Sequence, residues 1–150
     1  MSNSVNYFSE LYNYSFEDLF EGQTDIYTHT ITESDIRMFA AVSGDTNPIH
    51  LNDEFAKKSR FGGRIAHGLI SLGFISGIFG TKLPGPGAIY LSQSVQFKNP
   101  VMIGNTVVAR VTIKGKHNRK RTICFDTTCT VGNKMVLTGE AVIYMPKDIN

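Results

Sequence analysis

The sequence predicts an α+β fold in which an antiparallel sheet wraps around one apolar helix. Residues 68–80 carry no charge and are too few to cross a bilayer, which predicts a buried helix of roughly 20 Å. The last third of the chain alternates apolar and polar residues, as strands do. Tight turns between those strands favour hairpins and antiparallel pairing. A sheet with one apolar face buries that face best against the apolar helix.

The composition excludes several classes of protein. With 150 residues, 41% hydrophobic and 19% charged, the chain is expected to form an ordinary soluble globular domain. A net charge of +2 is too small to argue for nucleic acid, and no apolar run reaches the ~20 residues of a membrane span. Residues 1–20 contain no Lys or Arg, so we expect no targeting peptide and a cytoplasmic protein with neither a nucleic-acid nor a membrane partner.

The first half of the chain predicts an arm, a strand and two helices. Residues 1–15 have no clear period and are expected to be a loosely attached arm, followed by one domain over residues 16–150. Residues 24–31 alternate and predict the first strand. A capping-box pattern then starts a helix that ends at Gly44, and residues 52–58 predict a second, short helix.

The charge-free helix is apolar all round, so we expect it to be buried on nearly every side. Gly73 and Gly77 would let other backbone approach it closely. Strands are predicted over residues 89–97, 106–113, 123–131 and 135–144. Cys124 and Cys129 stand an odd number of positions apart in one strand, so we expect them on opposite faces without a disulfide.

A carboxylate and an imidazole flank a rigid corner at the end of the first predicted helix. Asp45 and His50 are separated by Asn47-Pro48, and Pro48 fixes its own φ while it restricts Asn47. Two such groups can hold and activate a water for general acid–base chemistry. An ordinary turn with a structural histidine is the alternative at this point.

His67-Gly68 lies at the predicted start of the apolar helix. Backbone N–H groups at a helix start are unpaired and lie at the positive end of the helix dipole. Gly68 would let a carbonyl oxygen approach such a group, as in an oxyanion hole. Taken alone, Gly68 equally fits a tight turn.

Two weaker signals have ordinary explanations. The basic segment 114–121 could bind the phosphates of coenzyme A or of a nucleic acid. A solvated hairpin tip explains its positive charges better. His29 and His117 have no partner at metal-ligand spacing, and no phosphate loop or dinucleotide fingerprint is present. We therefore expect neither a metal nor a cofactor.

Taken together, these motifs closely resemble the MaoC-like, (R)-specific enoyl-CoA hydratase (hydratase 2) family over roughly residues 16–145. The segments that carry the resemblance are Ala41–His50, Phe55-Ala56, Arg60–Gly68, Leu83–Gly87 and Gln93–Val101. The resemblance implies a hot-dog fold, a homodimer and an acyl-CoA substrate. The implied reaction is the reversible syn addition of water to a trans-2-enoyl-CoA, giving the (R)-3-hydroxyacyl-CoA.

The resemblance also implies roles for individual residues. Asp45 and His50 would be the catalytic pair, and the Gly68 N–H would polarise the thioester carbonyl. The substrate-binding residues expected on the same ground are Asn47, His67, Ser76 and Phe79. Three alternatives stay open: a 3-hydroxyacyl-thioester dehydratase acting on acyl-carrier protein, a hot-dog thioesterase, and a non-catalytic acyl-thioester-binding subunit. The intact Asp45/His50 pair argues against the last.

Overall fold

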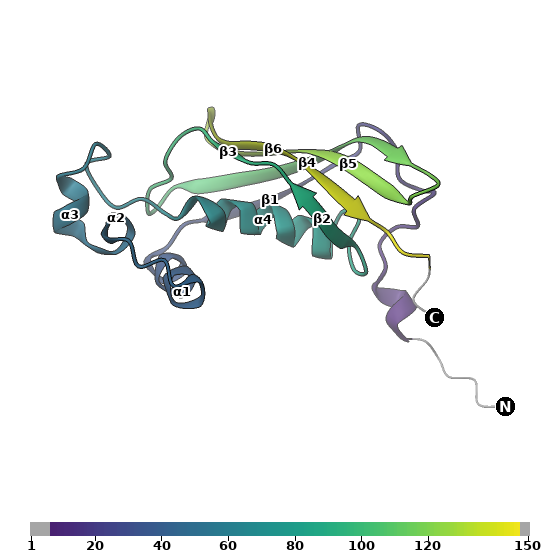
Figure 1. Cartoon of the computed structure of the whole chain (residues 1–150), viewed down its shortest axis with the longest axis horizontal. Helices are drawn as coiled ribbons and strands as arrows, with labels where there is room; N and C mark the ends of the chain where they lie inside the picture. Colours follow the sequence, from purple (N-terminus) through teal and green to yellow (C-terminus); the bar gives the residue numbers. More distant parts are fainter. Residues whose placement is uncertain (1–6, 148–150) are drawn as a thin grey trace.

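The computed structural model describes residues 7–147. In chain order the elements are the 3₁₀ helix η1 (Tyr7–Leu11), β1 (Thr24–Thr30), α1 (Glu33–Ser43), α2 (Pro48–Leu51), α3 (Asp53–Lys57), α4 (Gly68–Thr81), β2 (Ile89–Gln93), β3 (Gln96–Phe97), β4 (Thr106–His117), β5 (Thr122–Val131) and β6 (Lys134–Tyr144). Figure 1 shows α4 running beneath the sheet, with α1 to α3 gathered beyond the N-terminal end of α4.

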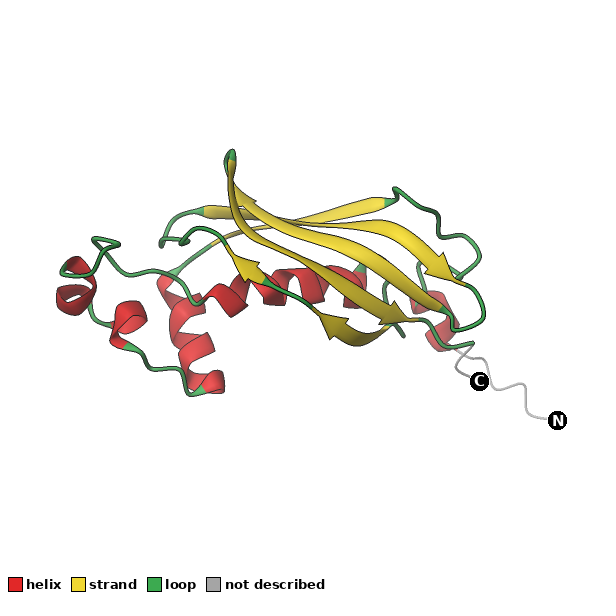
Figure 2. Cartoon of the chain, turned by 45° about the horizontal axis from the view of Figure 1, so that its top comes forward, coloured by secondary structure: helices red, strands yellow, loops and turns green. Residues whose placement is uncertain are grey.

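The sheet is antiparallel throughout and curves around one side of α4 (Figure 2). Its strand order is β1-β4-β5-β6-β2, and β3 pairs with β6 beside β2. Helix α4 contacts β1, β4, β5 and β6. This is the hot-dog architecture, so the predicted α+β fold is confirmed.

The core lies between the sheet and α4. In β4 every second residue is fully buried, as the alternation predicted, namely Val107, Ala109, Val111 and Ile113. Ile75, Ile78 and Phe79 of α4 meet them from the helix side. Full burial of the Val, Ile and Phe side chains among them contributes about 1.5–3 kcal/mol each, so this contact contributes much to the stability of the fold.

The prediction that α4 is buried on nearly every side is wrong for the single chain. Leu69 is 50% exposed, and Gly73, Ser76 and Gly77 are exposed on the same helix. The physical reason is that the sheet covers α4 from one side, whereas α1 meets only its N-terminal part. Exposed apolar faces of this kind are typical of interaction sites.

The strand predicted over residues 89–97 is also different from what the structure shows. It splits into β2 and β3, with a register shift inside β2. Ile89 and Leu91, which the alternation placed on the buried face, are exposed on the edge strand β2. At the break, the Ser94 carbonyl oxygen lies so close to Gly139 of β6 that a Cβ there would be 1.9 Å away.

Several local predictions are confirmed. Thr32 and Asp35 form the capping box of α1, and Gly44 ends that helix with a left-handed φ of 77°. Cys124 is exposed and Cys129 is buried, and both are free. Burial raises the pKa of the Cys129 thiol to about 12, as expected of an inert core cysteine.

The predicted division into an arm and one domain concerns the two ends of the chain. Residues 1–6 of the predicted arm and residues 148–150 lie outside the described part of the chain. Asn13, near the end of the arm, donates hydrogen bonds to the carbonyl oxygens of Thr81 and Lys82 at the end of α4. The division into residues 1–15 and 16–150 stays a prediction.

The basic segment 114–121 forms the β4–β5 hairpin tip, and two of its cations hold the chain near Phe16. Lys116 donates to the Phe16 carbonyl oxygen, and Arg121 pairs with Glu17. No helix among residues 7–147 is long and apolar enough to span a membrane.

Candidate active site

The loop between α1 and α2 presents the Asp45 carboxylate. Gly44 turns the chain out of α1, and the Asn47 N–H then donates to Asp45 Oδ1 over 3.2 Å. Asn47 in turn caps α2 by accepting the Ile49 N–H, and Pro48 occupies the first turn of that helix, which suits its fixed φ. The other carboxylate oxygen, Asp45 Oδ2, takes no part in the hydrogen bonds of this turn.

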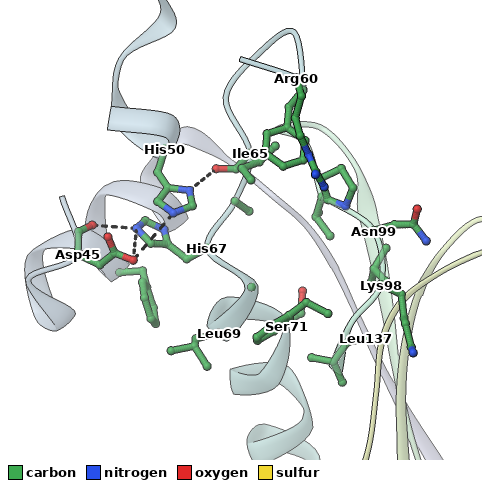
Figure 3. A pocket seen from close by; sticks show the side chains of 18 residues that line it. Asp45, His50, Arg60, Ile65, His67, Leu69, Ser71, Lys98, Asn99 and Leu137 are labelled. Atoms are coloured by element: carbon green, nitrogen blue, oxygen red, sulfur yellow. Dashed lines mark hydrogen bonds and ion pairs between the residues drawn. The ribbon is translucent and has the colours of Figure 1, made fainter. Parts of the chain in front are cut away.

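His50, in the last turn of α2, faces that free oxygen. Its Nδ1 lies 2.8 Å from the Ile65 carbonyl oxygen, which can only accept, so Nδ1 carries the proton. Its Nε2 therefore presents a lone pair, 3.9 Å from Asp45 Oδ2 (Figure 3). Two proton acceptors at this distance have room for a water that donates to both.

His67 closes the site from the start of α4. Its Nε2 lies 2.9 Å from the Asp45 carbonyl oxygen and must donate to it. Its ring stacks on the His50 ring, with centroids 3.8 Å apart. The His67 side chain is 2% exposed, so it belongs to the wall of the site.

Gly68 is the first residue of α4, and its N–H forms no hydrogen bond within residues 7–147. Such a donor at the positive end of the helix suits a developing oxyanion. A methyl group at Gly68 would lie 2.6 Å from Phe97 Cε1, so the ring of Phe97 occupies the space that a side chain would need. Glycine lets the Phe97 ring lie directly against the helix start.

A cavity of about 280 Å³ joins these groups. Four predicted residues line it together, namely Asp45, His50, His67 and Gly68. Asn47 supports the corner from an exposed position and does not line the cavity.

Ser76 and Phe79, predicted to bind substrate, do not line this cavity either. Phe79 is in the core, packed edge-on against Tyr90 and Phe125. Ser76 is exposed, eight residues or about 12 Å along α4 from Gly68. Within the single chain neither residue reaches this cavity, and their roles in substrate binding stay predictions.

The ligand atoms of Asp45, His50 and His67 lie within 4.8 Å of one another, a spacing compatible with a metal ion. However, His67 Nε2 uses its proton for the Asp45 carbonyl. One carboxylate and one imidazole nitrogen remain, fewer than the three protein ligands of a usual catalytic zinc site. The set is better suited to holding water, and a site without metal or cofactor stays a prediction.

The family model described as "MaoC like domain" matches residues 17–135, most of the chain. The chain belongs to this family. The MaoC-like chain is 53% identical over 131 residues to an "(R)-specific enoyl-CoA hydratase" of Rhodospirillum rubrum, covering 87% of this chain and 91% of the relative. It is 47% identical over 132 residues to a "3-hydroxybutyryl-CoA dehydratase" of Methylorubrum extorquens, covering 88% and 84%.

Among solved structures, the MaoC-like chain is similar to an (R)-hydratase from A. caviae described as involved in PHA biosynthesis. The TM-score is 0.84 at 37% identity, covering 87% of this chain and 99% of that one. The predicted family is confirmed by these matches.

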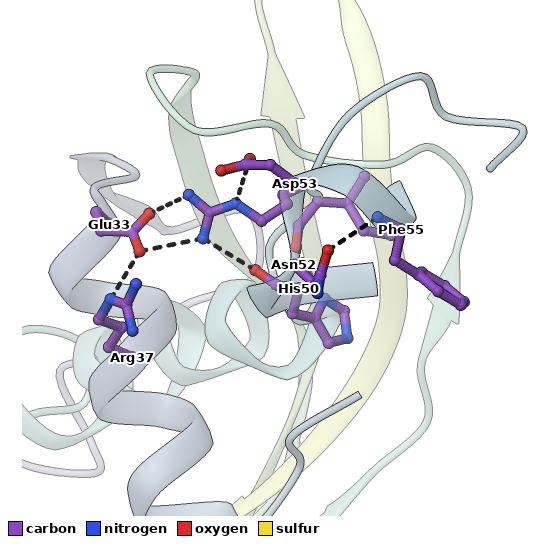
Figure 4. A network of polar contacts seen from close by, with 8 residues as sticks. Glu33, Arg37, His50, Asn52, Asp53 and Phe55 are labelled. Carbon is purple, nitrogen blue, oxygen red and sulfur yellow. Dashed lines mark hydrogen bonds and ion pairs between the residues drawn. The ribbon is translucent and has the colours of Figure 1, made fainter. Parts of the chain in front are cut away.

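Arg64 is a residue of the MaoC-like site to which the sequence assigned no role. Its side chain is 11% exposed. The guanidinium pairs with Glu33 of α1 and Asp53 of α3, and it also donates to the His50 carbonyl oxygen (Figure 4). Arg64 thereby ties three helices around His50. The hydrogen bond from Arg64 lowers the pKa of the Glu33 carboxyl, which keeps this network ionised.

Two further cations, Arg60 and Lys98, line the cavity together with Asn99. Neither cation is paired with a carboxylate within residues 7–147. Arg60 and Lys98 both lie within the segments that resemble the family, but no local pattern in the sequence singled them out as site residues.

Proposed function

We propose that the chain is an (R)-specific enoyl-CoA hydratase, which adds water reversibly to a trans-2-enoyl-CoA. The observation that carries the proposal is the pair of acceptors Asp45 Oδ2 and His50 Nε2, 3.9 Å apart, beside the open N–H of Gly68. The relatives named above bear hydratase and dehydratase names, which are the two directions of one reaction.

The chemistry follows from the acceptors. A water held by Asp45 and His50 donates one hydrogen bond to each and keeps a lone pair for carbon 3 of the substrate. As the C–O bond forms, the alkene electrons move onto the thioester oxygen as an enolate. The pair takes one proton from the water, and one proton is returned to carbon 2 on the same face. The product is the 3-hydroxyacyl thioester.

The thioester oxygen needs a donor while it carries the enolate charge. The Gly68 N–H, at the start of α4, supplies one without a cost of reorganisation. A fixed donor of this type contributes about 3–4 kcal/mol to stabilising a transition state. Gly68 thus acts on the carbonyl while Asp45 and His50 act on the water.

The carrier of the acyl group is coenzyme A in this proposal. Arg60 and Lys98 at the cavity give an anionic carrier two unpaired cations. Acyl-carrier protein is the alternative carrier, and the cations suit its phosphopantetheine as well. Comparing kcat/KM for crotonyl-CoA and for the crotonyl carrier protein separates the two.

The active form in this proposal is a homodimer. A second copy is the natural cover for the open face of α4 and the exposed edge of β2, where Ile89 and Leu91 face solvent. Sedimentation velocity at micromolar concentration tests this, because a monomer would contradict the proposal.

The deciding experiment follows the conjugated enoyl absorbance of crotonyl-CoA with the purified protein. We expect that absorbance to disappear, and chiral analysis to find the (R)-3-hydroxybutyryl product. Asp45→Asn and His50→Ala should each lose at least about two orders of magnitude in kcat. Release of free thiol instead of hydration would identify a thioesterase and overturn the proposal.

A further inference from the structure

His67 connects the two halves of the site, and nothing in the proposed reaction assigns it a role. We propose that His67 is a positioning residue that fixes the Asp45 carboxylate opposite His50, rather than a group that binds substrate. The proposal rests on the function proposed above. It is carried by one hydrogen bond, one ring stack and one unused nitrogen.

The hydrogen bond holds the backbone of the loop that carries the carboxylate. His67 Nε2 donates to the Asp45 carbonyl oxygen over 2.9 Å, while the Asp45 side chain itself is 49% exposed. The loop residues from Gly44 to Asn47 are all exposed, so they contribute little burial of their own. A buried donor reaching into this loop therefore sets where Asp45 can lie.

The ring of His67 sets the place of His50 as well. Its centroid lies 3.8 Å from that of His50, at an interplanar angle of 29°, and 4.7 Å from that of Phe39 of α1. Removing the ring would leave a gap beside His50. One side chain thus touches both members of the catalytic pair, as Figure 3 shows.

The state of the two ring nitrogens argues against a role of His67 in binding substrate. The Nε2 proton is already used by the Asp45 carbonyl. Nδ1 is buried from solvent and has no hydrogen-bond partner within residues 7–147. A substrate atom would have to displace neighbouring groups before it could reach either nitrogen.

His67 also occupies the N-cap position of α4 without capping it. A Ser, Thr, Asp or Asn at an N-cap usually accepts one of the first N–H groups of its helix. Because the His67 side chain points to Asp45 instead, it does not compete with a substrate carbonyl for these donors. The side chain thereby links the Asp45 loop to the helix start that carries Gly68.

Two substitutions separate the hydrogen bond from the ring. His67→Gln keeps an N–H near the position of Nε2, whereas His67→Phe keeps a ring between His50 and Phe39 but has no donor. We expect His67→Phe to lose kcat on the order of 100-fold with little change in KM, since a misplacement of about 1 Å has this effect. His67→Gln restores the donor but not the ring, so it should recover part of that loss.

Other outcomes of these kinetics overturn the proposal. A rise in KM with kcat retained would make His67 a substrate-binding residue. Equal losses in both variants, together with equally lowered thermal stability, would make it merely structural. Full activity of His67→Phe would show that the hydrogen bond is not needed.

A second measurement does not depend on activity, so it distinguishes failure of this inference from failure of the proposed hydratase function. Long-range ¹H–¹⁵N correlation spectra of the whole protein report the tautomer of each histidine. We expect His67 as the Nε2–H tautomer and His50 as the Nδ1–H tautomer, as their carbonyl partners demand. A His67 that carries its proton on Nδ1 would overturn the inference even in an active enzyme.

Discussion

Gly68→Ala is the substitution whose effect the structure defines most closely. The added methyl carbon would lie 2.6 and 2.7 Å from two ring carbons of Phe97, about 1 Å inside an ordinary carbon–carbon contact. Because Phe97 is 53% exposed, its ring can swing away, so the fold should lose little stability. The methyl group nevertheless stays beside the N–H that, in the proposed reaction, donates to the thioester oxygen.

We therefore expect Gly68→Ala to lower kcat for crotonyl-CoA by up to about 10²–10³-fold, the effect of losing one oxyanion donor, because the methyl group obstructs the approach of the thioester oxygen to the N–H. Thermal unfolding measured alongside should change by no more than a few degrees. The matched control is Phe97→Ala, which removes the ring and keeps the glycine, and which should lose much less. The double variant should stay as slow as Gly68→Ala.

Two results would refute this reasoning. Near-normal kcat in Gly68→Ala would mean that a methyl group at this position does not obstruct the approach of the carbonyl oxygen to the N–H. Full recovery in the Gly68→Ala/Phe97→Ala double variant would mean that the loss came from the displaced ring alone.

Three further predictions concern stability and assembly. Gly139→Ala should lower the free energy of unfolding by about 1–3 kcal/mol, because its methyl would lie 1.9 Å from a backbone oxygen, whereas Gly115→Ala in open space is the control. The pairing of Glu33 with Arg64 lowers the Glu33 pKa, so it stabilises the fold fully above about pH 4.3, the pKa of a glutamate in the unfolded chain. The difference in melting temperature between wild type and Glu33→Gln should therefore shrink as the pH falls through the lowered pKa of the folded state. A difference that stays constant with pH would contradict this prediction. Leu91→Lys, on the exposed edge strand, should shift sedimentation toward a monomer, and an unchanged dimer would place the interface elsewhere.

The parts of the site that could be predicted are those written in local patterns. The Asn47-Pro48 corner, the carboxylate and imidazole beside it, and the glycine at a helix start are each short-range features. They line one cavity because the N-terminal end of α4 lies next to the loop between α1 and α2 in the fold. Helix α4 was predicted correctly because the charge-free run is also a short-range feature, contained in one continuous segment.

What the sequence did not predict depends on distant contacts. Arg64 reaches Glu33 across 31 positions, and no spacing rule connects them. Ser76 and Phe79 lie on a helix that is apolar all round, so the sequence does not say which residues face the sheet and which stay open. The exposed Leu91 shows the same limit, because alternation assigns a face but not what covers it.

The central claim is that Asp45 and His50 handle both protons of the reaction from one face of the substrate. Hydration of crotonyl-CoA in D₂O, with NMR analysis of the relative configuration at carbons 2 and 3, tests it directly. One deuterium at carbon 2, on the same face as the new hydroxyl group, is the predicted result. Deuterium on the opposite face would require a proton donor across the substrate from this pair and would contradict the account.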